Sequence, residues 1–286
     1  MEWFVPTPDG RTLAVEDAGD RSGRPVMVHV GTPGGRRLYG RRTLADAQRR
    51  GLRLITYDRP GYGGSTAQPG RGTADCAGDV RVICAALGVE KLAMLGSSGG
   101  GPHVLACAAL LPDLVTAVAS LASLAPYDAA GLDWLSGFSA EAVEEVRLML
   151  ADPAASRSYF QQERAEMLAL PPAQLAADMA PRTPGADLEL LTDEAISMQL
   201  AMAPGIEGAW EDCVAQITPW GFEVSQIAVP VLLLHGGQDT AVPFSHGQWL
   251  AAHIPGVEAW FFDDEGHALR EKHIADIHGW LLEHSA

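Results

Sequence analysis

The stretch KLAMLGSSGGGPHV, residues 91–104, decides the fold of this chain. It predicts a short apolar strand at 92–95, a turn of small residues, and a helix from 103 to 111. The central pentapeptide Gly96-Ser97-Ser98-Gly99-Gly100 fits the pattern Gly-x-Ser-x-Gly, in which a serine occupies the tip of a tight strand-to-helix turn. An ordinary Gly-Ser turn would have the same composition. The flanking strand and the alanine-rich helix favour Ser98 as a nucleophile instead.

Strand and helix patterns alternate on both sides of this stretch. They predict strands at 2–5, 11–17, 25–30, 52–57, 115–121, 229–234 and 257–262, and helices at 38–50, 73–87, 245–253 and 269–283. The first two strands flank Pro8-Asp9-Gly10, which suits a hairpin turn. The later elements have the lengths of βαβ units, which predicts an α/β fold with a mostly parallel, doubly wound sheet. Ligands of such sheets bind beyond the carboxyl ends of the strands, where Ser98 lies.

The alternation stops between residues 126 and 228. This region predicts helices near 139–151, 154–170, 173–180, 193–203 and 206–217, and several prolines separate them. We therefore expect a sheet-containing core, residues 1–125 and 229–286, and a helical cap insert, residues 126–228, over the sheet edge. A chain of 286 residues is long enough for this arrangement, since about 75% of the unfolded surface is buried at this size.

Charge and hydropathy exclude several classes of protein. The formal net charge is -16, and residues 1–120 hold 14 Lys and Arg and 11 Asp and Glu, against 6 and 25 in the remainder. This balance argues against nucleic-acid partners, which require clustered basic residues. The only basic concentration is expected to be a solvated helix face; it consists of Arg36, Arg37, Arg41, Arg42, Arg49, Arg50 and Arg53. No membrane-length apolar run or signal peptide is present, so no membrane partner and a cytoplasmic location are expected.

Cysteines and possible metal ligands offer no further site. The four cysteines match neither a disulfide framework nor a paired zinc motif, so free thiols are expected at Cys76, Cys84, Cys107 and Cys213. Cys76 and Cys84 could share one helix face, where two buried small residues are the simpler interpretation. Histidines and carboxylates do not occur at metal-ligand spacing, and we predict no metal and no cofactor.

Two polar side chains follow the last two predicted strands. Asp239 ends the segment His235-Gly236-Gly237-Gln238-Asp239, and His267 ends Asp263-Asp264-Glu265-Gly266-His267. A serine hydroxyl needs a neighbouring imidazole as base, and the imidazole needs a carboxylate to fix its tautomer and stabilise its charged form. Ser98, His267 and Asp239 supply all three groups.

Taken in chain order, these motifs resemble the α/β-hydrolase fold superfamily, in which serine precedes the acid and the acid precedes the histidine. The resemblance covers nearly the whole chain and rests on Gly31-Thr32-Pro33-Gly34, Asp58-Arg59-Pro60-Gly61-Tyr62-Gly63, the Ser98 turn, and the Asp239 and His267 segments. It implies a serine hydrolase with a helical cap, of the esterase or proline iminopeptidase-like branch. It also implies an oxyanion hole made by the backbone N–H groups of Thr32 and Gly99.

One position departs from many members of the superfamily. They have a histidine directly before the glycine of the oxyanion loop, whereas this chain has Val30 there and His29 one place earlier. Adjacent strand residues point to opposite faces, so His29 is not expected to replace the missing side chain. The oxyanion donors are backbone groups and should survive the change.

Several other residues have competing interpretations. Asp128, after the strand at 115–121, could replace Asp239 as the acid, since some relatives take it from that position. His103 and His246 are expected to be structural or surface histidines, and His235 to shape the acid loop. Asp58 and Arg59 should brace their turn beneath the insert rather than touch substrate.

The insert adds substrate-binding surface of two kinds. It is rich in large apolar side chains, some of which should line an apolar pocket above Ser98. It also holds 17 Asp and Glu against 4 Arg, which predicts either a solvated outer surface or selection of a cationic substrate. In proline iminopeptidases, which share the fold, acidic residues of the insert hold a substrate amine. Candidates for that role here are Glu163, Glu166, Glu194, Glu207 and Glu211.

These observations favour hydrolysis of a carboxylic ester or lactone of a small organic molecule. An aminopeptidase of the proline iminopeptidase type is the second prediction, and a low-turnover, receptor-like ligand-binding homologue is the third. Acyl transfer to another alcohol stays open. Dehalogenase and epoxide hydrolase chemistry is disfavoured, because those relatives have Asp at the nucleophile position. Fold alone does not name the substrate, and the sequence leaves the oligomeric state undetermined.

Overall fold

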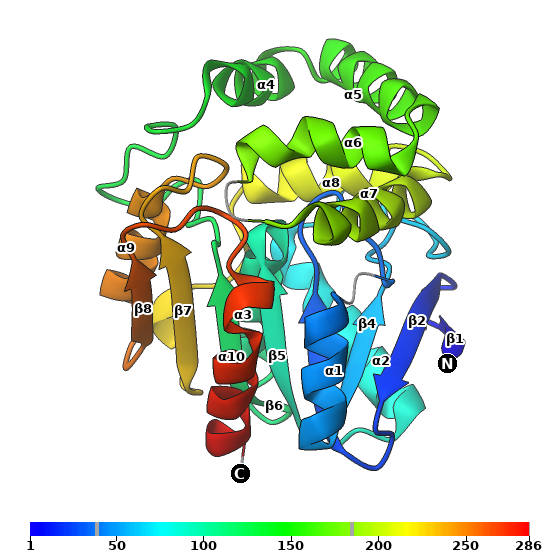
Figure 1. Cartoon of the computed structure of the whole chain (residues 1–286), viewed down its shortest axis with the longest axis vertical. Coiled ribbons are helices and arrows are strands. Elements are labelled where there is room, and N and C mark those ends of the chain that lie inside the picture. The colour runs from blue at the N-terminus through cyan, green and yellow to red at the C-terminus, as the bar shows by residue number, and fades with distance from the viewer. Residues whose placement is uncertain (38–39, 184–185, 286) are drawn as a thin grey trace.

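A computed structural model describes residues 1–37, 40–183 and 186–285 of the chain. Its centre is an eight-stranded sheet with the order β1-β2-β4-β3-β5-β6-β7-β8 (Figure 1). The strands are β1 (Glu2–Pro6), β2 (Thr12–Gly19), β3 (Arg24–His29), β4 (Leu52–Tyr57), β5 (Leu92–Ser97), β6 (Val115–Leu121), β7 (Val231–Gly236) and β8 (Glu258–Phe262). β1 and β2 pair antiparallel, β2 also pairs antiparallel with β4, and the strands from β4 to β8 are parallel. The predicted hairpin and parallel sheet are confirmed.

Helices cover both faces of the sheet, as the continuous apolar strands require. One core contains residues of α1 (Arg41–Arg50) and α10 (Arg270–His284) against the sheet, including Ala47, Ile277 and Trp280. The other contains residues of α2 (Cys76–Leu87), α3 (Gly101–Leu110) and α9 (Phe244–His253). Figure 1 shows α1 and α10 together in front of the sheet. The carboxyl ends of β3 and β5 to β7 are thereby held at one edge.

In the described part of the insert, residues 126–228, five α-helices lie together over this edge (Figure 1). They are α4 (Ala140–Ala151), α5 (Pro153–Ala169), α6 (Pro172–Met179), α7 (Leu188–Met202) and α8 (Glu207–Gln216). α7 begins five residues earlier than predicted, because Asp187 caps it by accepting a hydrogen bond from the N–H of Leu190 at 2.7 Å. α1 begins at Arg41, and residues 38 and 39 of its predicted start lie outside the described residues.

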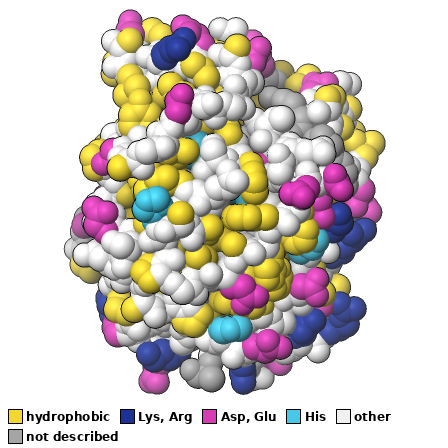
Figure 2. Space-filling model, turned by 90° about the vertical axis from the view of Figure 1, so that its left-hand side faces the viewer, with side chains coloured by type: hydrophobic (Ala, Val, Ile, Leu, Met, Phe, Trp, Pro, Cys, Tyr) yellow, Lys and Arg dark blue, Asp and Glu magenta, His cyan; other side chains and the backbone are white. Residues whose placement is uncertain are grey.

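The arginines near α1 are not all on a solvated face, so that prediction is wrong for two of them. Arg53 is buried and donates two 2.9 Å hydrogen bonds to Asp17. Arg36 forms ion pairs with Asp58 and Glu2. On the face of the molecule that Figure 2 shows, Lys and Arg lie mostly in the lower half.

Some of the acidic side chains of the insert face these arginines. Arg41 pairs with Glu189 and Asp193, and Arg42 lies 3.9 Å from Asp187. These pairs join α1 to the start of α7, and both arginines are largely exposed.

The cysteines are free, as expected, and Cys76, Cys84 and Cys107 are buried. Within residues 1–37, 40–183 and 186–285, no helix is both long and apolar enough to cross a bilayer. Over the same ranges, no three His, Cys, Asp or Glu side chains gather as a set that could hold a metal ion.

Candidate active site

Ser98 lies at the junction of β5 and α3, at the carboxyl edge of the sheet. Its φ of 53° is rare for a residue with a side chain, and this strained turn presents the hydroxyl at the strand end. Glycines on either side allow the chain to fold back this tightly. A Cβ on Gly96 would lie 2.6 Å from the carbonyl oxygen of Gly100, and one on Gly100 would overlap the carbonyl oxygen of His29. The Gly-x-Ser-x-Gly stretch is therefore a strained elbow rather than an ordinary turn.

Asp239 and His267 come together from two loops that follow neighbouring strands. Nδ1 of His267 lies 2.7 Å from Oδ2 of Asp239, whose side chain is fully buried. The other carboxylate oxygen accepts the backbone N–H groups of Ala241 and Val242, both at 2.9 Å. This leaves Nε2 of His267 free to act on a substrate. Asp128, the alternative acid, is exposed.

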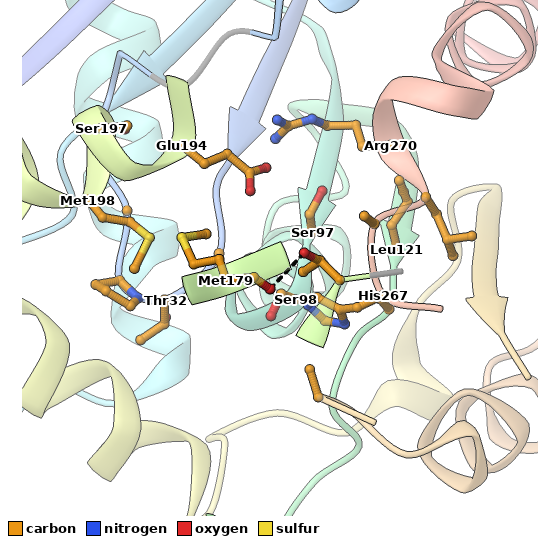
Figure 3. Close-up of a pocket in the computed structure, with 18 residues that line it drawn as sticks. Thr32, Ser97, Ser98, Leu121, Met179, Glu194, Ser197, Met198, His267 and Arg270 are labelled. Atoms are coloured by element: carbon orange, nitrogen blue, oxygen red, sulfur yellow. Dashed lines mark hydrogen bonds between the residues drawn. The ribbon is translucent and has the colours of Figure 1, made fainter. Parts of the chain in front are cut away.

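Ser98 and His267 line the same pocket, a cavity of about 340 Å³ beneath the insert (Figure 3). Apolar side chains from the sheet edge and from the insert form much of its wall; they include Leu121, Met179 and Met198. No hydrogen bond joins these two described side chains. Contacts between nucleophile and base are often long without substrate and tighten in the complex.

The loop Gly31-Thr32-Pro33-Gly34, which the sequence predicts to carry an oxyanion donor and which we call the oxyanion loop, packs directly on Ser98. A Cβ added to Gly31 would lie 3.3 Å from Cβ and 3.7 Å from Oγ of Ser98. Thr32, which precedes a cis proline, also contacts the elbow, since a Cβ on Gly99 would overlap its hydroxyl. The structure thus brings Thr32 and Gly99 together beside Ser98.

His29 does not take the place of the histidine that this loop lacks. His29 is 2% exposed, and its ring lies 5.3 Å from that of Tyr57 and 5.9 Å from that of His103. Val30 packs into the core on the other face of the sheet. The prediction that His29 points away from the site agrees with this packing.

A buried carboxylate of the insert holds the oxyanion loop in place. Asp212, on α8, is fully buried and accepts the Thr32 hydroxyl at 2.8 Å and the Tyr62 hydroxyl at 2.9 Å. Arg59 donates to the same carboxylate at 2.5 and 3.0 Å, and Arg71 donates to its other oxygen. Burial alone would raise the pKa of Asp212, but the two guanidinium groups outweigh it and hold the pKa well below its usual range. Asp212 is therefore an anion balanced by two cations.

Arg59 extends this contact to the backbone of the loop. It donates to the carbonyl oxygens of Val30, at 2.7 Å, and Gly31, at 3.0 Å. Asp58 accepts the N–H groups of Arg36 and Gly64. The prediction that Asp58 and Arg59 brace their turn is consistent with these bonds. Asp212 was missed, because nothing in the sequence of α8 shows which of its acidic side chains contacts the loop at Thr32.

Three other histidines near the site have structural partners. Burial, with the cation of Arg59 beside it, lowers the pKa of His103 to about 3, and its Nδ1 lies 2.9 Å from the carbonyl oxygen of Gly99. Burial lowers the pKa of His246 to about 4, and its ring bridges the loop at Ala125 and the carbonyl oxygen of Trp134. His235 contacts the carbonyl oxygen of Val242 at 2.9 Å, within the acid loop.

Only one of the five candidate glutamates of the insert lines the Ser98 pocket, namely Glu194 on α7. Glu163 and Glu166 are exposed on α5, Glu207 pairs with Arg157, and Glu211 accepts the N–H of Gly70. Burial raises the pKa of Glu194, against the opposing effect of Arg270 and His267. Arg270, which sequence reasoning did not single out, lines the same pocket.

Comparison with known proteins agrees with the fold. A family model described as "alpha/beta hydrolase fold" matches residues 24–273. The chain belongs to this family. It is similar to a 2-hydroxy-6-oxononadienedioate/2-hydroxy-6-oxononatrienedioate hydrolase of Klebsiella pneumoniae, with 24% identity over 96% of this chain and 91% of that protein. It is also similar to a non-heme chloroperoxidase of Streptomyces lividans, with 29% identity over 84% and 83%.

Among solved structures, a thermophilic esterase from Thermogutta terrifontis superposes with a TM-score of 0.71 and 21% identity, and the match covers 100% of both chains. At this identity the likeness concerns the fold. The family match and the hydrolase among its relatives identify this member of the alpha/beta hydrolase family as an enzyme of the hydrolase class.

Proposed function

We propose that this member of the alpha/beta hydrolase fold family is a serine hydrolase that cleaves a carboxylic ester or lactone of a small organic molecule. The observation that carries the proposal is the 2.7 Å contact between Asp239 and His267, beside the strained turn at Ser98 in one pocket. A carboxylate that fixes Nδ1 of a histidine leaves Nε2 to act as a base on a serine.

The proposed reaction has two halves. Ser98 Oγ attacks the ester carbonyl carbon, and Nε2 of His267 takes the hydroxyl proton while Asp239 stabilises the imidazolium. The negative oxygen of the tetrahedral intermediate accepts N–H groups of Thr32 and Gly99. As the carbon–oxygen bond breaks, His267 returns the proton to the leaving alcohol. Water then attacks the acyl-enzyme by the same route and releases the acid.

The pocket supports a small substrate. A cavity of about 340 Å³ is at the lower end of the range for small-molecule sites. The apolar wall suits hydrocarbon parts of a substrate, and the reaction as written needs no cofactor.

An aminopeptidase of the proline iminopeptidase type is the alternative, and Glu194 is the observation that favours it. A carboxylate on the pocket wall could hold a substrate amine. In that case proline or alanine anilides would be cleaved, and Glu194→Gln would weaken their binding.

Labelling with a fluorophosphonate probe tests the nucleophile. We expect Ser98 to be labelled and Ser98→Ala to escape labelling. Loss of the serine or the histidine of such a triad costs about 10⁶-fold in turnover, so Ser98→Ala and His267→Ala should retain almost no esterase activity. An unlabelled serine in the native protein would favour the receptor-like alternative. A panel of esters, lactones and amino-acyl amides then separates the remaining reactions, with an added alcohol as an acceptor to detect acyl transfer.

A further inference from the structure

Arg270 places a buried cation, whose guanidinium donates no hydrogen bond among the described residues, on the wall of the Ser98 pocket. It is the first residue of α10, three positions after His267, and its side chain is 9% exposed. Its Nε is buried without a hydrogen-bond partner, and its guanidinium donates no hydrogen bond to any side chain or backbone group that the structure describes. Figure 3 shows the group directed into the pocket above Ser97 and Ser98.

The nearest carboxylate to Arg270 is already used elsewhere. Glu271 Oε1 lies 3.5 Å from Nε of Arg270. The same carboxylate accepts the backbone N–H of Arg42 at 3.2 Å, the N–H of Thr43 at 3.3 Å and the Thr43 hydroxyl, at the start of α1. Glu271 therefore accepts hydrogen bonds from the start of α1 and does not complete the hydrogen bonding of Arg270.

Glu194, unlike Glu271, lines the Ser98 pocket, and its carboxylate points toward the same part of the pocket as Arg270 (Figure 3). No ion pair joins it to Arg270, both of them described residues. The two charges also differ chemically. A carboxyl group whose pKa is raised by burial can become neutral by taking a proton, whereas a guanidinium group cannot lose its charge in a protein. Arg270 therefore carries a permanent charge whose ion pair with Glu271, at 3.5 Å, leaves its N–H donors without a hydrogen-bond acceptor among the described residues.

A guanidinium group offers parallel N–H donors that match the two oxygens of a carboxylate. We propose that Arg270 binds a carboxylate of the substrate, so that the enzyme acts on esters or lactones carrying a free carboxylate, such as half-esters of dicarboxylic acids. This inference rests on the proposed ester hydrolysis at Ser98, because it names the substrate class of the same pocket. Arg270 is then a specificity-determining residue that touches the substrate away from the reacting carbonyl.

The test compares esters that differ only in the distal group. Monoethyl butanedioate, pentanedioate and hexanedioate are each paired with the ethyl ester of the monocarboxylic acid of equal chain length, and acid release is followed by titration. The native enzyme should prefer the half-ester in at least one pair. Arg270→Gln should lower the ratio of kcat/KM for half-ester over neutral ester by roughly 10- to 100-fold, the range for losing a hydrogen bond to a charged group.

Two variants show whether the effect is specific. Arg270→Lys keeps the charge without the paired donors and should recover part of the ratio. Lys272→Gln removes another cation of α10. Lys272 pairs with Glu265 and does not line the Ser98 pocket. Its ratio should equal that of the native enzyme.

A second measurement does not depend on turnover. The half-esters should slow fluorophosphonate labelling of Ser98 in the native enzyme more than the neutral esters do, and Arg270→Gln should abolish the difference. If Ser98 reacts but the half-esters neither protect it nor are preferred, or Arg270→Gln leaves the ratio unchanged, the inference is overturned and the serine hydrolase proposal stands. If Ser98 of the native enzyme is not labelled and no ester is cleaved, both are overturned.

Discussion

Replacing Asp212 by asparagine should destabilise this enzyme strongly. The carboxylate is fully buried and is the counter-charge of two buried arginines, Arg59 and Arg71. An amide of the same shape would leave both guanidinium groups without a counter-charge, and removing one member of a buried ion pair costs about 3–5 kcal/mol. At roughly 2–4 °C per kcal/mol for a chain of this size, Tm should fall by about 6–20 °C.

The same change should slow catalysis at temperatures where the variant is folded. Thr32 donates its hydroxyl to Asp212, and Arg59 ties the same carboxylate to the carbonyl oxygens of Val30 and Gly31. Loss of one oxyanion donor costs about 10²- to 10³-fold in turnover, so a displaced Thr32 should lower kcat by about 10-fold or more. The assays are a urea titration and ester hydrolysis well below the Tm of the variant.

Asp17→Asn is the matched control. Asp17 is also fully buried and accepts two hydrogen bonds from Arg53, between β2 and β4. It should lose stability similarly but keep the native kcat, because it does not contact the oxyanion loop. The reasoning is refuted if Asp212→Asn loses less than about 1 kcal/mol, or if its kcat matches that of the control.

Three further predictions concern the site and its surroundings. Gly99→Ala would push its methyl group into the Thr32 hydroxyl and should lower kcat by about 10²- to 10³-fold with little change in KM; an unchanged kcat would argue against Gly99 as an oxyanion donor. Glu194→Gln should raise kcat/KM for half-esters severalfold, since it removes a like charge beside the substrate carboxylate; a loss of anilide cleavage instead would indicate the aminopeptidase. The free energy of unfolding should fall as the pH drops below about 6.5. In the folded protein His103 and His246 are buried, with pKa values of about 3 and about 4, so they stay neutral at a pH where the same histidines of the unfolded chain bind protons. Each of these two histidines should lower the free energy of unfolding by up to about 2 kcal/mol at pH 5. Equal midpoints of urea unfolding at pH 7.5 and pH 5 would contradict this.

The sequence was sufficient to predict the candidate site residues that follow strands, namely Ser98, Asp239 and His267. A strand end, a run of small residues and a single polar side chain are local patterns, and they marked Ser98, Asp239 and His267 before the structure placed the latter two in contact. The sheet could be predicted for the same reason, because the period of apolar residues reports on burial of a strand or helix.

Contacts across the long insert could not be predicted in this way. Asp212 and Thr32 are separated by 180 positions, and no local pattern connects an acidic residue of a helix with a loop so far away. Likewise, the helical pattern of the insert did not show that Glu194, rather than the other four glutamates, lines the pocket. Arg53 was misplaced on a solvated face because its partner Asp17 lies on another strand.

The Asp212 contact also limits how this protein could be recombined with its relatives. A donor segment replacing α4 to α8 would need to supply an acid group at the place of Asp212. Without that acid group, Arg59 and Arg71 would remain buried without a counter-charge, next to the loop that contains Thr32. Whether such a chimaera folds should therefore depend more on an acid group at position 212 than on the shape of the transplanted helices.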